Sequence, residues 1–253
     1  MRKFLSFALA LFVFTVPADI TIMADTESNI PAEPVFLAKR DQAAWVSSRS
    51  ASIYKSPGST RIGSIAFGDG LEVIGEKDAW LNVKDGSGRT AWIRKSHVSS
   101  LWILVEKKKR RLTFLETRSS LESWRVDLGG RPVGDKVMSG DNRTPEGEFY
   151  VCRKVPHSNY YKAFLISYPS THHAERGLKE GLITQAQHAA IVRAIKGRRI
   201  PPQNTQLGNL IEIHGHGTYG LYDWTLGCVA VPDKAMDFMW DKVIVGTPIL
   251  ILP

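Results

Sequence analysis

Cysteine is scarce in this chain of 253 residues, which has two, Cys152 and Cys228. Neither belongs to a C-x-x-C pair, and the adjacent His172 and His173 have no partners at metal-ligand spacing. The sequence therefore predicts no metal and no cofactor. An oxidising compartment permits a disulfide between the two cysteines, but it would remove both thiols from nucleophilic chemistry.

Long apolar runs are also lacking. The longest, residues 4–16, is shorter than the roughly 20 residues that span a bilayer, and it follows Arg2 and Lys3. This arrangement is typical of a signal peptide, for which we expect cleavage after Ala24, with Ala18 as the alternative; an uncleaved anchor is the other interpretation. The sequence thus predicts an exported protein, with a leader at residues 1–24 and a linker at residues 25–44.

Acidic residues are outnumbered, 25 against 33 basic ones, for a net charge of +8. Such an excess favours anionic partners. Because the chain has no zinc-finger, RRM or helix-turn-helix pattern, we expect no nucleic acid but peripheral association with anionic wall polymer or lipid headgroups; the oligomeric state is left open. The densest basic run, residues 107–111, lies between two apolar runs and predicts a solvated hairpin turn.

Residues 45–100 contain short runs of β-strand character separated by turn-forming segments. The runs are residues 45–47, 52–54, 62–65, 71–74, 80–83 and 91–93. So many short strands in so few residues predict a small β-barrel. The Trp80-x-x-Val83 strand and the closing Gly-x-x-Ala-Trp-Ile segment resemble a bacterial SH3 domain, which implies a module that binds cell-wall peptide. A structural spacer is the alternative.

Residues 101–253 form the second predicted domain, which is mainly β with a helical insertion. Further strands are expected at residues 102–106, 112–115, 124–128, 149–152 and 165–169. Cys152 lies in one of them and is expected to be a packed core thiol. A capping-box pair, Thr184 and Gln187, predicts a helix that ends at Gly197, and a second helix is expected from Asp233 to Trp240.

Residues suited to nucleophilic chemistry gather in residues 211–230. A strand-like segment delivers His214 onto a glycine-flanked turn, and Cys228 follows in a Thr-x-Gly-Cys turn. A cysteine is an effective nucleophile as thiolate, which requires a neighbouring base. Glycines such as Gly227 let backbone N–H groups point into a site, as an oxyanion requires. On composition alone, each residue is equally consistent with a buried structural position.

The order of these motifs carries more information than their composition. His-Gly followed by Thr-x-Gly-Cys, with the Thr-Pro-x-Gly-x-Phe element at residues 144–149 and the strand at residues 165–169, resembles the L,D-transpeptidase family, the cysteine enzymes of peptidoglycan. The resemblance covers residues 101–253 and implies a β-sandwich or barrel-like catalytic domain. It implies Cys228 as nucleophile, His214 as general base and the carbonyl of Gly215 as the group that orients the imidazole.

Several further roles follow from the same resemblance. The N–H groups of Leu226, Gly227 and Cys228 would form the oxyanion hole. From the position of the thiol on a turn of backbone donors, next to an imidazole, we also expect the cysteine and His214 to rest as a thiolate–imidazolium pair. Asp223 is a rival orienter of His214, although capping its own turn is the simpler role, and His216 is the rival base. Substrate contacts are expected from a wider set: His216, Thr225, Asp223, Arg143 and Tyr168.

The implied substrate is the diaminopimelate-containing stem peptide of peptidoglycan, and the implied location is the periplasm or cell envelope. Cys228 would release D-alanine and form an acyl-enzyme, which the amine of another stem converts to a cross-link. If water resolves it, the enzyme is an L,D-carboxypeptidase or endopeptidase. Ala230 stands where the family usually has arginine, as it does in a branch that cleaves protein–wall links, so hydrolysis stays open.

Two interpretations from other classes remain. A wall-binding protein with an inactive domain would need neither His214 nor Cys228, yet both are present. A papain-like protease requires its cysteine before its histidine, and the order here is the reverse.

Overall fold

The computed structural model describes residues 43–48, 50–117 and 119–253. The expected leader, residues 1–24, and residues 25–42 of the expected linker lie outside this range. Ala43 and Ala44, which the sequence placed in the linker, instead belong to the first strand. No helix in the described part of the chain is long and apolar enough to cross a membrane.

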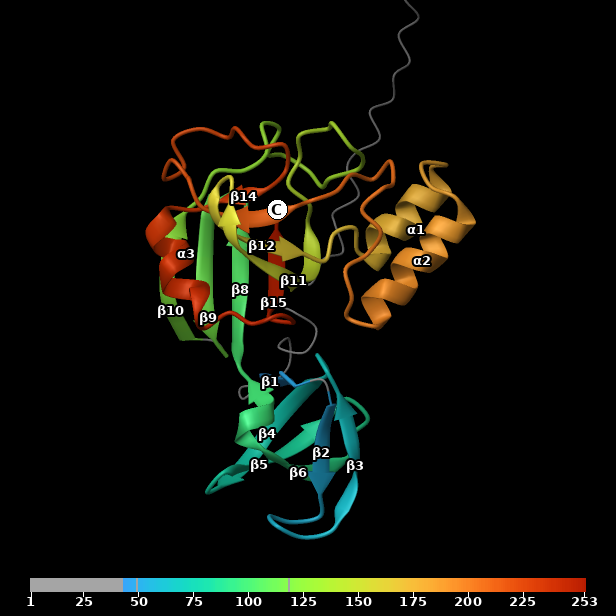
Figure 1. Cartoon of the computed structure of the whole chain (residues 1–253), viewed down its shortest axis with the longest axis vertical. Coiled ribbons are helices and arrows are strands. Elements are labelled where there is room, and N and C mark those ends of the chain that lie inside the picture. The colour runs from blue at the N-terminus through green and yellow to red at the C-terminus, as the bar shows by residue number, and fades with distance from the viewer. Residues whose placement is uncertain (1–42, 49, 118) are drawn as a thin grey trace, which may run out of the picture.

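The N-terminal unit is a curled sheet of seven strands in the order β3-β2-β6-β5-β4-β1-β7, at the bottom of Figure 1. The strands are β1 (Ala43–Val46), β2 (Ser50–Tyr54), β3 (Arg61–Ala66), β4 (Gly70–Lys77), β5 (Trp80–Asp85), β6 (Thr90–Arg94) and β7 (Val98–Ser99), with a 3-10 turn, η1 (Lys95–His97), before β7. Each of the six predicted runs overlaps one of these strands. Small apolar side chains such as Ala51, Ile53 and Val83 fill its core.

The C-terminal unit is a sheet of eight strands in the order β10-β9-β8-β15-β11-β12-β13-β14. The strands are β8 (Leu101–Glu106), β9 (Arg111–Glu116), β10 (Ser119–Arg125), β11 (Gly147–Ser158), β12 (Tyr161–Ile166), β13 (Glu212–His214), β14 (Val229–Ala230) and β15 (Pro248–Leu252). The last strand inserts between β8 and β11 and runs parallel to β8. A large apolar core, with side chains from β8, β9, β11, β12, β13, β14 and β15, lies against this sheet.

Three helices flank this sheet (Figure 1): α1 (Thr171–Lys179) and α2 (Gln185–Lys196) lie together on one side, and α3 (Asp233–Trp240) lies on the other. The predicted capping box of α2 is confirmed, because Thr184 accepts from the N–H of Gln187 while the Gln187 side chain accepts from the N–H of Thr184. The sequence missed α1. It packs so closely on the following loop that a Cβ at Gly177 would lie 2.6 Å from a methyl carbon of Leu207.

The basic run at residues 107–111 forms the expected hairpin turn between β8 and β9, but its expected full solvation is wrong. Lys107 is 3% exposed. Its Nζ donates to Glu146 Oε1 at 2.6 Å and to the carbonyl oxygens of Gly134 and Thr144. The turn therefore anchors the segment before β11 rather than presenting a wholly solvated cluster of charge.

Candidate active site

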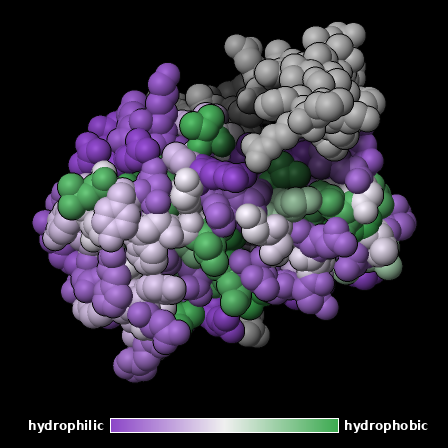
Figure 2. Space-filling model, turned by 90° about the horizontal axis from the view of Figure 1, so that it is seen from above, coloured by the Kyte–Doolittle hydropathy of each residue, from purple (hydrophilic) through white to green (hydrophobic). Residues whose placement is uncertain are grey.

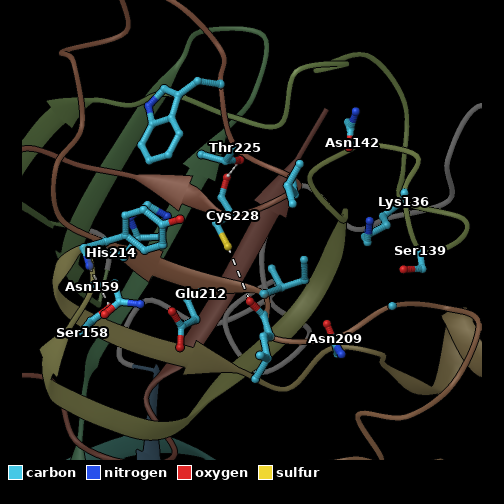
Figure 3. Close-up of a pocket in the computed structure, with 17 residues that line it drawn as sticks. Lys136, Ser139, Asn142, Ser158, Asn159, Asn209, Glu212, His214, Thr225 and Cys228 are labelled. Carbon is cyan, nitrogen blue, oxygen red and sulfur yellow. Dashed lines mark hydrogen bonds between the residues drawn. The ribbon is translucent and has the colours of Figure 1, made fainter.

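A cavity of about 680 Å³ opens beside the ends of β13 and β14. It is lined by residues from the segments 136–142, 208–214 and 224–228, together with residues 158–160 of the β11–β12 hairpin (Figure 3). The lining residues are Lys136, Ser139, Gly140, Asn142, Ser158, Asn159, Tyr160, Gly208, Asn209, Leu210, Ile211, Glu212, His214, Trp224, Thr225, Leu226 and Cys228. His214 and Cys228, 14 positions apart in the sequence, thus share one cavity.

His214 is the last residue of β13. Its neighbour Ile213 packs into the core, so alternation along the strand turns the imidazole to the opposite, cavity face. Nδ1 donates to the carbonyl oxygen of Gly215 at 2.7 Å, which leaves Nε2 as the proton acceptor. Tyr160 stacks on the ring at 4.5 Å between centroids. The imidazole is therefore held in one orientation by a backbone carbonyl and an aromatic face.

Gly215 permits this arrangement because the chain is crowded there. A Cβ at this position would lie 2.5 Å from Asp233 Oδ1 and 2.9 Å from the carbonyl oxygen of Tyr160. Any larger residue would push the turn after His214 away from the β11–β12 hairpin.

Cys228 directly precedes β14, and its side chain projects into the cavity (Figure 3). The thiol donates to the carbonyl oxygen of Leu210, with Sγ 3.5 Å away. The hydroxyl of Thr225 donates to the carbonyl oxygen of Cys228 at 2.8 Å and accepts from the N–H of Gly227 at 3.1 Å. Thr225 therefore fixes the Thr-x-Gly-Cys turn from inside.

The pKa shifts of Cys228 and His214 are opposite to those that the expected thiolate–imidazolium pair requires. Burial is the largest cause that raises the pKa of the Cys228 thiol to about 11, and the negative charge of Glu212 adds to it, against the opposing effects of a hydrogen bond from the Glu212 backbone and of Lys136. Burial lowers the pKa of His214, against a smaller opposing effect of its hydrogen bond to Gly215. Both shifts favour the neutral forms at neutral pH. These directions disfavour the expected ion pair in the unliganded site.

This assignment predicts the pH dependence of alkylation at Cys228. Because the thiolate is the reactive form and the thiol pKa is about 11, the rate with a small electrophile should be low at pH 7 and rise steadily into the alkaline range. His214→Ala should shift this profile little, since the neutral imidazole is not the partner of a charged sulfur. A rate already at its plateau at pH 7 would contradict the assignment.

The structure modifies the expected oxyanion hole. The N–H of Gly227 is already engaged with Thr225 Oγ1. The N–H groups of Leu226 and Cys228 are the remaining donors of the predicted set. Leu226 lies on the turn itself, is 76% exposed and lines the cavity.

Four of the other predicted site residues lie apart from the cavity lining. Asp223 accepts three bonds from the Arg110 guanidinium and one from the N–H of Leu128, so it neither orients His214 nor caps its own turn as expected. His216 is exposed, and its N–H donates to Asp233. The remaining two make structural contacts: the hydroxyl of the buried Tyr168 donates to the carbonyl oxygen of Leu207, and the Arg143 guanidinium donates to the backbone carbonyl oxygen of Asp135. Of the proposed substrate contacts, Thr225 is the one that lines the cavity.

Asp127 is a structural residue of the site that the sequence analysis missed. It is fully buried and accepts from the N–H and hydroxyl of Thr218, the N–H of Gly220 and Nε1 of Trp224, at 2.6 to 2.9 Å. These bonds hold the loop after His214, and they place Trp224 with its ring centroid 5.8 Å from that of His214. No local signal marked Asp127, because its partners lie about 90 residues further along the chain.

Glu212 was also missed, although its signal was present in the sequence. In the Ile-Glu-Ile-His run, alternation places Glu212 on the face of His214. The carboxylate lines the cavity beside Cys228 (Figure 3).

The second cysteine has a different environment. Cys152 lies on β11 and is free, as is Cys228. Burial raises its pKa to about 12, so its thiol is inert at neutral pH. Within the described part of the chain, no group of three or more His, Cys, Asp or Glu residues could hold a metal ion.

Comparison with known proteins gives a family match. The model of the YkuD family, the L,D-transpeptidase catalytic domain, matches residues 100–251. No curated protein matches the chain.

Among solved structures, the chain is similar to Bd1075 of Bdellovibrio bacteriovorus (24% identity, TM-score 0.40, covering 61% of this chain and 48% of that one). It is also similar to an L,D-transpeptidase of Xylanimonas cellulosilytica (17% identity, TM-score 0.36, covering 60% of this chain and 60% of that one). A third similar structure is that of the helical cell shape determining protein Pgp2 of Campylobacter jejuni (22% identity, TM-score 0.40, covering 60% of this chain and 47% of that one). The chain thus spans between 47% and 60% of the length of these structures.

Proposed function

This chain belongs to the L,D-transpeptidase catalytic domain family, and from that premise we propose that it modifies peptidoglycan stem peptides through an acyl-enzyme on Cys228. The observation that carries the proposal is that Cys228 and His214 line the same cavity, within the matched residues. The cavity of about 680 Å³ is large enough for a short peptide.

The proposed reaction begins with proton transfer from the Cys228 thiol to Nε2 of His214. The sulfur then attacks the carbonyl carbon of the diaminopimelate residue, and the N–H groups of Leu226 and Cys228 stabilise the oxyanion. Collapse breaks the C–N bond, and the imidazolium returns its proton to the departing D-alanine. The amine of a second stem, or water, then attacks the thioester and releases the sulfur.

Hydrolysis is the second candidate outcome, and Ala230 favours it. Ala230 is fully buried and forms a bridge with Asp127 where the family resemblance leads one to expect an arginine. Without that guanidinium, the site lacks one cation that would position an incoming stem. Lys136, a cation in the cavity lining, is already paired with Asp141 at 2.7 Å.

Incubation with purified muropeptides and mass analysis of the products tests the function. We expect loss of D-alanine from stem peptides, with a dimer as product if an amine resolves the acyl-enzyme and a shortened monomer if water does. Unchanged muropeptides under all conditions would instead favour a wall-binding protein without activity.

We further propose that the protein is exported to the periplasm or cell envelope and that its N-terminal sheet, which resembles a bacterial SH3 domain, binds the wall. The basic composition supports contact with anionic polymer. A chain that begins at residue 101 should then sediment with intact sacculi less than the full chain, yet still process soluble muropeptide. Equal sedimentation of both chains would refute the targeting role.

A further inference from the structure

Glu212 is placed beside the nucleophile by strand register. The parallel pairing of β13 with β14 sets Ile213 opposite Val229 and His214 opposite Ala230. Continued by one position, it sets Glu212 opposite Cys228, and alternation along β13 turns Glu212 to the same face as His214. All three side chains line the cavity (Figure 3).

The Glu212 carboxylate is half-buried and lacks a partner. In the described part of the chain, no donor lies within hydrogen-bond distance of its oxygens. Burial raises its pKa, and the opposing effect of Arg153, an exposed residue of β11, is smaller. Desolvating a carboxylate without compensation costs free energy, so proteins usually pair such groups.

Neighbouring acidic groups show the contrast. Asp141 accepts from Lys136 and from three backbone N–H groups, and Asp127 accepts four bonds. The charged and titratable groups that face Glu212 are Cys228 and His214, both neutral at rest, Lys136, which Asp141 already neutralises, and Arg153. The carboxylate is thus an unneutralised negative charge that opens into the substrate cavity.

We propose that Glu212 binds the free side-chain ammonium of the diamino acid next to the bond that Cys228 attacks. The inference rests on the proposed function and specifies its substrate: the stem must carry an unmodified cationic amine. A carboxylate only accepts hydrogen bonds, so its best partner is a cationic donor, and the ammonium compensates the desolvation that the empty site leaves uncompensated.

Binding of this ammonium also changes the reactivity of the thiol. The charge of Glu212 disfavours the thiolate at Cys228. A cation on Glu212 cancels that effect, so the nucleophile becomes easier to ionise when the correct substrate is present. Selectivity and activation then arise from one carboxylate.

Peptide binding to the full-length Cys228→Ala protein tests the inference without turnover. Two stem peptides differ only in acetylation of the side-chain amine, and calorimetry gives both dissociation constants. The free amine should bind about tenfold or more tightly than the acetylated one, and Glu212→Gln should abolish that preference. Glu175→Gln, on the exposed side of α1, is the matched control and should preserve it. A preference that survives Glu212→Gln overturns the inference.

Alkylation of Cys228 in the otherwise wild-type protein gives a second readout. Glu212→Gln removes a negative charge and should shift the pH dependence of the alkylation rate to lower pH, whereas Glu175→Gln should leave it unchanged. An unshifted profile in a folded variant also overturns the inference. If stem peptides are turned over but the preference for the free amine does not depend on Glu212, this inference alone is refuted. If neither peptide binds, the proposed substrate is refuted as well.

Discussion

Replacing Cys228 by alanine should lower the release of D-alanine from stem peptides by at least about a thousandfold, to the level of a control without enzyme. The variant removes the atom that attacks the carbonyl carbon, and no other thiol can take its place. The fold should persist, because the thiol makes one long hydrogen bond to Leu210 and lies half-buried at the cavity. Release of D-alanine by liquid chromatography, with circular dichroism of the variant, gives both results.

Cys152→Ala is the matched control, because it removes the other thiol of the chain. Its pKa is about 12 and it lies outside the cavity lining, so turnover should change less than about twofold. If Cys152→Ala abolishes turnover in a folded protein while Cys228→Ala does not, the assignment of the nucleophile is wrong.

Replacing Lys107 by methionine should lower the free energy of unfolding by about 3–5 kcal/mol. The substitution leaves Glu146, itself 3% exposed, as a buried charge without its partner. It also removes the donor to the carbonyl oxygens of Gly134 and Thr144. Urea unfolding followed by tryptophan fluorescence measures the loss.

The effect of Lys107→Met should extend to the active site. Thr144 lies in the segment that Lys107 anchors, and its hydroxyl accepts from the N–H of Gly129 at 2.9 Å and reaches the carbonyl oxygen of Cys228 at 3.5 Å. We therefore expect turnover to fall as well, even under conditions in which the variant is folded.

Two further variants separate a buried ion pair from a general loss of charge. Adding Glu146→Gln to Lys107→Met should recover part of the stability, because the uncompensated charge is gone. Lys109→Met, whose side chain is 59% exposed and pairs with Glu106, should cost less than about 1 kcal/mol. Equal losses for Lys107→Met and Lys109→Met would refute the buried pair.

Local pattern was sufficient to predict much of the fold. Turn residues and alternating apolar positions marked the strands of the N-terminal sheet, and the Thr184–Gln187 pair marked the start of α2. The family resemblance assigned to residues 101–253 is confirmed by the match at residues 100–251. The resemblance of residues 45–100 to a bacterial SH3 domain stays a prediction.

Features that depend on distant partners were not predictable. Asp223 meets Arg110 across 113 positions, and nothing near Asp223 in the sequence indicates that contact. Lys107 is buried because Glu146 lies opposite it in the fold, whereas a run of basic residues alone indicates a solvated turn. Helix α1 was missed because tertiary contacts such as that of Gly177 with Leu207 outweigh its weak local signal.

The protonation state of Cys228 illustrates the same limit at the active site. The cysteine and its histidine were recognised from their motifs, and the structure places them in one cavity. Burial and the charge of Glu212 then raise the pKa of the thiol, which disfavours the expected thiolate. Burial is a property of the folded chain, so no reading of the Thr-x-Gly-Cys turn could supply it.

The acyl-enzyme itself is the most direct test of the central claim. Wild-type protein mixed with a stem peptide and quenched by acid within one turnover should gain the mass of the peptide minus D-alanine. Proteolysis should then locate the adduct on the fragment that contains Cys228, and the Cys228→Ala protein should gain none. Product formation without any adduct on Cys228, or an adduct on another residue, would contradict the account.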